Sequence, residues 1–190
     1  MTKGVDVFRE ELHPISSPRR RELVEAFFNE VVPDYFWEIA ASSSGKYHSG
    51  FDCCEGGLVK HTKMTVAVAN EMHRLEKYLG VNMDVVIAAL LIHDTFKNGE
   101  SGRHPHADHP QIAARKFLEF AEEKGYEDMG FVRRIYNCVY MHMGQWTTKA
   151  ALAAAPNCVP SQPDAEIELV HLSDYISSRK FFDLVKEETA

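Results

Sequence analysis

Apolar residues recur at intervals of three and four along several segments of this 190-residue chain, which is the period of an amphipathic α-helix. The stretch 85–92, VVIAALLI, differs because it is apolar on every side, and this predicts a fully buried central helix. His93 and Asp94 follow it directly. An ionised carboxylate at the end of such a helix is costly unless it is paired or bound to a metal. The doublet by itself leaves a metal site and a structural hydrogen-bonded pair equally open.

Three further segments of helical period each carry a metal-ligand type of side chain in the apolar stripe. The stripe of segment 58–79 comprises Leu58, His61, Thr65, Val68, Met72 and Leu75, and Gly80 is expected to end that helix. The stripes of segments 131–143 and 165–185 comprise Val132, Ile135, Val139 and His142, and Ile167, Val170, Asp174 and Phe181. A lone histidine on an apolar face is usually a satisfied core residue. Four such positions directed into one core are difficult to satisfy without a cation, so the pattern favours a metal site.

Local signals predict how the other segments begin and connect. Residues 17–18, Ser-Pro, fit the N-cap and first position of a helix whose arginines 19–21 we expect on the solvated surface. A short aromatic helix at 35–40 should pack over the core, and Asn82 is the expected cap of the central helix. Residues 147–163 are rich in alanine and proline and form a long connection, which is typical of a lid or binding loop.

Composition narrows the classes of function. The formal net charge of −7 disfavours broad binding to a nucleic-acid backbone, which requires a basic surface, but it allows a small phosphorylated substrate. No segment approaches the roughly 20 apolar residues of a membrane span, and the N-terminus lacks the apolar core of a signal peptide. We therefore expect one cytoplasmic domain without membrane contact. The cysteines form no C-x-x-C pair and are expected to be reduced; they are Cys53, Cys54, Cys138 and Cys158.

The ligand candidates lie in three motifs, GGLVKHT with His61, ALLIHDTFK with His93 and Asp94, and VHLSDYISSRK with Asp174. In this order the motifs resemble the HD-domain superfamily of metal-dependent phosphohydrolases, over roughly residues 56–180. The resemblance implies an all-α fold, a single-domain bundle of about six to eight helices around a buried metal site. It places the HD core at about 56–185, after an N-terminal helical extension at 1–55, within one domain covering 1–190.

The resemblance assigns a first metal to His61, His93, Asp94 and Asp174. Two imidazoles and two carboxylates suit one divalent transition metal, Fe, Mn, Ni, Co or Zn, and also allow Mg. A bound metal of this kind lowers the pKa of water from about 15.7 towards 7, which would generate the hydroxide that attacks phosphorus.

A second ion would be held by His109 and His142, with Asp94 bridging the two ions. Asp108 is the expected N-cap of the helix that opens with His109, and a His-Pro opening of this helix is a common second-metal ligand in the family. Two-metal members often show His-His-Gly where this chain has His142, Met143 and Gly144. The departure leaves the second position with a vacancy that water or His104 would fill, and His104 is also the substitute for His109.

The implied reaction is hydrolysis of a phosphomonoester or phosphodiester on a small, nucleotide-like substrate, with Asp94 and Lys97 as the catalytic residues. Lys97, one turn beyond the doublet, would neutralise charge on the phosphoryl oxygens. The candidate substrate-binding residues are Lys46, His48, Lys97, His104 and Arg179. The loop that carries Lys46, SSSGKYHSG, reads equally well as a phosphate grip and as an ordinary surface loop.

Two other functions are compatible with the same motifs. The HD scaffold also carries di-iron oxygenases such as myo-inositol oxygenase, which use a similar set of six ligands. A nucleotide-binding or sensor module that retains the metal without turnover is the other alternative, and the intact HD-x-x-K motif disfavours it. We expect no stable nucleic-acid partner, and neither the metal's identity nor the oligomeric state follows from the sequence.

Overall fold

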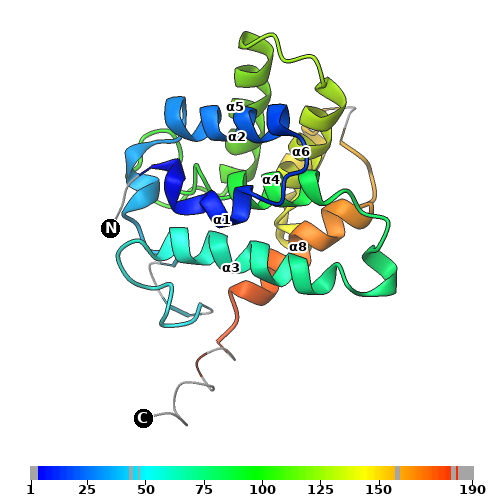
Figure 1. Ribbon diagram of the computed structural model, residues 1–190. Coiled ribbons are helices and arrows are strands. Elements are labelled where there is room, and N and C mark those ends of the chain that lie inside the picture. Colours follow the sequence, from blue (N-terminus) through cyan, green and yellow to red (C-terminus); the bar gives the residue numbers. More distant parts are fainter. Residues whose placement is uncertain (1–3, 43–44, 47, 157–158, 181–182, 184–190) are drawn as a thin grey trace.

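The all-apolar segment forms helix α4 (Met83–Ile92), which lies at the centre of the molecule (Figure 1). Every residue from Val85 to Ile92 is at most 1% exposed, as the sequence predicts. The side chain of Asn82 caps the helix, because its oxygen accepts a hydrogen bond of 3.1 Å from the backbone N–H of Asp84. Helices from both the N-terminal and the C-terminal half of the chain surround α4.

This computed structural model describes residues 4–42, 45–46, 48–156, 159–180 and 183. Within those residues the chain is helical and contains no strand. The α-helices are α1 (Arg9–Leu12), α2 (Pro18–Glu30), α3 (Gly57–Met72), α4, α5 (His109–Glu123), α6 (Met129–Met141), α7 (Lys149–Ala153) and α8 (Ala165–Ser177). Short 3-10 helices span Val5–Phe8, Asp34–Trp37, Glu76–Tyr78 and Gly144–Trp146. The fold is therefore the predicted all-α bundle, and none of the described helices is long and apolar enough to cross a bilayer.

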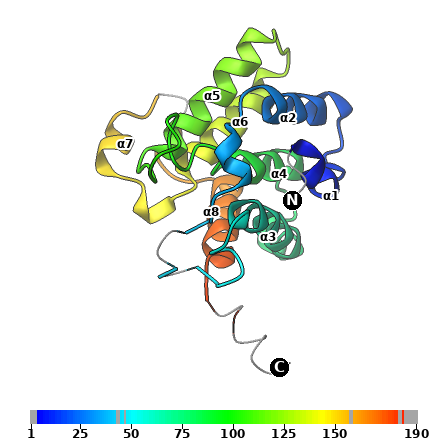
Figure 2. The ribbon, with the colours of Figure 1, turned by 90° about the vertical axis from the view of Figure 1, so that its left-hand side faces the viewer.

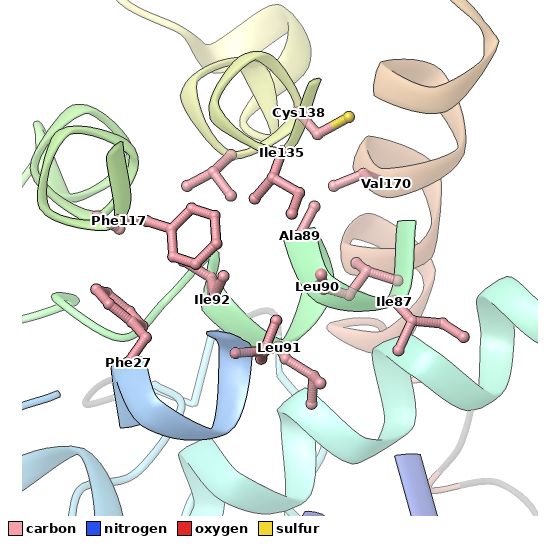
Figure 3. Packing of buried hydrophobic residues seen from close by; sticks show 14 of the residues in the cluster. Phe27, Ile87, Ala89, Leu90, Leu91, Ile92, Phe117, Ile135, Cys138 and Val170 are labelled. Carbon is pink, nitrogen blue, oxygen red and sulfur yellow. The ribbon is translucent and has the colours of Figure 1, made fainter. Parts of the chain in front are cut away.

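The core is built by the apolar faces that pack around α4. Figure 3 shows α4 side chains between Phe27 of α2, Phe117 of α5, Ile135 of α6 and Val170 of α8. Phe27 and Phe117 meet edge to face, with ring centroids 5.2 Å apart. Figure 2 shows α4 between α2 and α3, and His93 and Asp94 follow directly after its C-terminal end.

The beginning of α4 is tied to the N-terminal segment by a buried carboxylate. Asp84 is 6% exposed and accepts two hydrogen bonds of 2.8 Å from Ser16, one from the backbone N–H and one from the hydroxyl. Arg20 donates to the same carboxylate at 3.1 Å and to Asp128 at 2.7 Å. The expectation that residues 19–21 are simply solvated is thus wrong for Arg20, because two acidic partners from distant segments hold it.

The helix after the glycine pair is shorter than expected. It ends at Met72 rather than at Gly80, and Leu75 of the predicted apolar stripe is 55% exposed. The chain turns instead into the 3-10 helix Glu76–Tyr78, which packs against α8 and buries Tyr78 to 3% exposure. In this segment the core therefore contains Tyr78, and Leu75 faces solvent.

The connection 147–163 and the last helix differ from expectation, whereas the described cysteines agree with it. The connection 147–163 contains a short helix, α7, where no clear period is visible in the sequence. Helix α8 ends at Ser177, before the expected limit, and Phe181 lies outside the described residues. The thiols of Cys53, Cys54 and Cys138 are free, and Cys158 is not among the described residues.

Candidate metal centre

Five helices bring the six predicted ligand side chains to one place at the C-terminal end of α4. His61 comes from α3, His93 and Asp94 follow α4, His109 opens α5, His142 follows α6, and Asp174 lies in the last turn of α8. The imidazoles and Asp94 are between 0% and 8% exposed, and the side chain of Asp174 is 19% exposed. They form two adjoining clusters that share Asp94.

The first cluster contains His61, His93, Asp94 and Asp174. The His61 Nε2 lies 3.0 Å from Asp174 Oδ1, and the His93 Nε2 lies 3.7 Å from the same oxygen. The His93 Nε2 is also 3.6 Å from Asp94 Oδ2. Metal–ligand bonds of roughly 2.0–2.2 Å place ligand atoms about 3–4 Å apart. These separations therefore fit a single cation between the four side chains.

The second cluster contains His109, His142 and the other oxygen of Asp94. The His109 Nε2 is 2.9 Å from Asp94 Oδ1 and 3.3 Å from the His142 Nε2. The His142 Nε2 is 3.9 Å from Asp94 Oδ1. Asp94 thus directs Oδ2 to the first cluster and Oδ1 to the second, which is the geometry of a bridging carboxylate.

Backbone carbonyls fix the orientation of three imidazoles. The Nδ1–H groups of His93, His109 and His142 donate to the carbonyl oxygen three residues earlier, at 2.6, 2.7 and 2.7 Å. A carbonyl can only accept, so in each neutral ring the proton is on Nδ1 and the Nε2 lone pair faces the cluster. Such a contact behind the ring is the usual support of a metal-binding histidine.

The residues fit a metal because the clusters contain acceptors that lack donors. The buried Nε2 of His93 has no hydrogen-bond partner among the described residues. In the second cluster, the lone pairs of His109 and His142 face each other and a carboxylate oxygen. Lone pairs in such contact repel unless a cation or a proton lies between them. Each of the two ligand triplets that include Asp94 also has its ligand atoms within 4.8 Å of one another.

Burial keeps two of the imidazoles neutral. It lowers the pKa of His142 to about 3, and the neighbouring His93 and His109 contribute in the same direction. Burial also lowers the pKa of His61 below its usual value, against the opposing effect of Asp174. At neutral pH these rings therefore offer lone pairs, which is the form that binds a metal.

The carboxylates stay ionised and give the site its attraction for positive charge. Burial would raise the pKa of Asp94, but Lys97 and His93 hold it well below its usual value. For Lys97 burial acts against the charge, yet Asp94 raises its pKa, and the Lys97 Nζ lies 2.5 Å from Asp94 Oδ2. Asp94 and Asp174 raise the pKa of His93 despite its burial. Ionised carboxylates beside the neutral imidazoles of His61 and His142 are the donor set of a divalent cation site.

The loop before α3 places a further carboxylate behind His61. Asp52 is 2% exposed, and its Oδ2 lies 3.7 Å from the otherwise unpartnered Nδ1 of His61. The same oxygen is 3.0 Å from the Nδ1 of His48. The glycine pair makes this approach possible: Gly56 has a φ of 68°, and a Cβ on Gly57 would lie 1.9 Å from the Asp52 carbonyl oxygen.

A cavity of about 550 Å³ opens onto the metal centre. Its polar lining includes Asp94, Lys97, His109, His142 and Asp174. His48 and Arg179 also line it, and the Arg179 guanidinium lies over the ring of Tyr175, 4.4 Å from the centroid. A volume of this size is within the range of roughly 300–1,000 Å³ that small-molecule sites occupy.

Two candidate substrate-binding residues lie elsewhere. Lys46 and His104 are exposed, and neither is among the described residues that line the cavity or form the ligand clusters. Their roles remain predictions. Sequence reasoning also missed Asp52, Trp146 and Tyr175. The one signal for Asp52 was an acidic residue in the loop just ahead of the glycine pair of α3.

An imidazole–carboxylate centre buried in a helical bundle, at the base of a cavity, defines a metal-binding α-helical domain. The family model described as HD domain matches residues 58–179, so the chain belongs to the HD-domain family. The family is one of metal-dependent phosphohydrolases, and its domains bind divalent metals. No curated protein and no solved structure matches the chain.

Proposed function

We propose that the protein is a phosphohydrolase that cleaves a phosphomonoester or phosphodiester bond of a small, nucleotide-like molecule. The observation that carries the proposal is the convergence of two ligand clusters and a partly buried lysine, Lys97, on one carboxylate, that of Asp94, inside a cavity. A divalent cation bound there supplies Lewis acidity and lowers the pKa of water from about 15.7 towards 7.

The protein's own side chains have separate tasks in this proposal. His61, His93, Asp94 and Asp174 hold the first cation, and His109 and His142 complete the second position together with Asp94.

Lys97 keeps its proton at neutral pH and lines the cavity, so its ammonium group is placed to contact phosphoryl oxygens as negative charge develops on them. Arg179, in the same lining, is a second cation for the phosphate.

The alternative, a di-iron oxygenase, would use the same six side chains. Lys97 favours hydrolysis, because its positive charge beside the Asp94 carboxylate is suited to pairing with an anionic substrate such as a phosphate ester. Phosphate release without oxygen supports hydrolysis, whereas iron-dependent oxygen consumption with a phosphate-free substrate supports the oxygenase.

The test combines elemental analysis of the purified protein with a panel of phosphomonoesters and phosphodiesters under Mn, Ni, Co and Mg. We expect about one or two equivalents of metal and metal-dependent release of phosphate. Asp94→Ala should lose bound metal and hydrolysis together. Asp34→Ala, which removes an exposed carboxylate outside the site, is the matched control and should retain both. Full hydrolysis by Asp94→Ala would refute the proposal.

A further inference from the structure

An exposed tryptophan stands at the opening of the cavity. Trp146, at the end of the 3-10 helix Gly144–Trp146, is 49% exposed and lines the cavity. It stacks on Tyr175 of α8, with ring centroids 5.4 Å apart and an angle of 19° between the ring planes. The Arg179 guanidinium lies over the same tyrosine ring. Stacking orients the indole while leaving about half of the residue's surface accessible.

The position of this tryptophan is tied to the metal centre through His171. The Nδ1–H of His171 donates to the backbone carbonyl of His142 at 2.8 Å, and its ring centroid lies 5.8 Å from that of Trp146. Gly144 makes the approach possible, because a Cβ there would lie 2.4 Å from the His171 ring. The backbone of the candidate ligand His142, the imidazole of His171 and the exposed indole of Trp146 thus form one series of contacts.

The lining of the cavity has two chemical characters. One part is charged and includes Asp94 and Lys97, and the other is apolar and includes Met143, Trp146 and Tyr175. A ligand without an apolar or planar group, such as a sugar phosphate, would leave the apolar part in contact with water. A ligand with a phosphate and a planar ring would cover both parts, since every nucleobase has a π-face that stacks on an aromatic side chain.

We propose that Trp146, supported by Tyr175, determines specificity by stacking on the base of a nucleotide whose phosphate lies beside Lys97. This rests on the proposed hydrolysis for its kinetic test, but base stacking itself is independent of turnover. Because stacking tolerates different bases, the residue selects nucleotides over ring-free phosphates rather than one base over another.

The kinetic test compares AMP with ribose 5-phosphate, which share the ribose and the phosphate and differ in the base. We expect Trp146→Ala to lower the ratio of the two kcat/KM values about 5- to 150-fold, which corresponds to about 1–3 kcal/mol at 1.4 kcal/mol per tenfold. Trp146→Phe should recover most of the ratio. Leu152→Ala, an exposed apolar residue of α7 that is 48% exposed, is the matched control and should leave the ratio unchanged. An equal fall for both substrates would overturn the proposal.

A binding test separates this inference from hydrolysis. Trp146 and Trp37 are the two tryptophans of the chain, and Trp37 is only 9% exposed. AMP added to the metal-free protein should quench the tryptophan fluorescence, and ribose 5-phosphate at the same concentration should not. Trp146→Phe should abolish the quenching. If wild-type protein hydrolyses no phosphate ester but shows this quenching, the hydrolysis proposal fails and the stacking proposal stands. Equal responses to the two ligands would refute stacking.

Discussion

Replacing Asp52 by Asn should weaken metal binding without removing a ligand. The buried Asp52 carboxylate lies 3.7 Å from the Nδ1 of His61, a nitrogen that has no hydrogen-bond partner among the described residues. The same Oδ2 accepts from His48 at 3.0 Å. An asparagine keeps the shape and one accepting oxygen, so it can serve one of the two imidazoles but carries no charge.

The size of the effect follows from the geometry. Removing the carboxylate behind a metal-binding histidine typically costs 10- to 100-fold in metal affinity. At 3.7 Å the Asp52–His61 contact is longer than a hydrogen bond, so Asp52 acts here mainly through its charge. We therefore expect a loss in the lower part of that range, about 10- to 30-fold, or about 1.4–2 kcal/mol.

Calorimetric titration of metal-free protein with Mn²⁺ measures this change directly. Glu55→Gln is the matched control, because it removes one carboxylate charge from the same loop at an exposed position. We expect the Glu55→Gln protein to bind Mn²⁺ as the wild type does, and a circular-dichroism melt to show that Asp52→Asn is folded. Equal Mn²⁺ affinities of the wild type and Asp52→Asn would refute the role assigned to Asp52.

Three further predictions concern stability. Chelation should lower the Tm and Mn²⁺ should restore it, because a metal at a concentration of 100 Kd raises the free energy of unfolding by about 2.7 kcal/mol. An unchanged calorimetric Tm would argue against a structural metal. Phe27→Ala should cost about 3–5 kcal/mol in urea unfolding, because it removes a fully buried ring that packs on Phe117; a loss below about 1 kcal/mol would contradict this packing. Burial would raise the pKa of Asp84, but Ser16 and Arg20 hold it below its usual 3.8, so the unfolded chain binds the proton more readily. The contribution is thus full above about pH 5 and is lost progressively as the pH falls through 3.8 and then through the lower folded value. Asp84→Asn should therefore cost about 1.5–3 kcal/mol at pH 7 and less at pH 3 in urea unfolding, and an equal cost at both would contradict the assignment.

The central part of the fold can be predicted from the sequence because helices that pack in the core carry apolar residues at regular positions. Helix α4 follows from its unbroken apolar run, the inward face of α6 from apolar spacing, and the Asn82 cap from the preference of asparagine for that position. The candidate ligands on these helices lie together because each replaces an apolar residue in a stripe that already faces the core. A side chain on a buried helix face is confined by its packed neighbours and is therefore directed into the core.

Residues outside the α-helices follow no such spacing. Asp52 and Trp146 stand outside any helical stripe, and their positions depend on contacts with segments distant in sequence. Arg20 likewise meets Asp84 and Asp128 across 64 and 108 positions, and spacing along the chain cannot reveal such pairs. Side chains that support or select a ligand are therefore harder to predict than those that would hold the metal.

Two helices present their carboxyl ends to the metal centre, since His93 is the residue that caps α4 and His142 the one that caps α6. Helix α5 presents its amino end there, beginning at His109. Peptide dipoles give the first two ends partial negative charge and the third partial positive charge. The backbone alone therefore creates a field that favours a cation beside an anion, before any side chain is considered. Substituting a ligand that belongs to one cluster only, such as His61 or His142, should consequently weaken ion binding without abolishing it, because each such variant retains Asp94 and the polarity of the surrounding peptide groups.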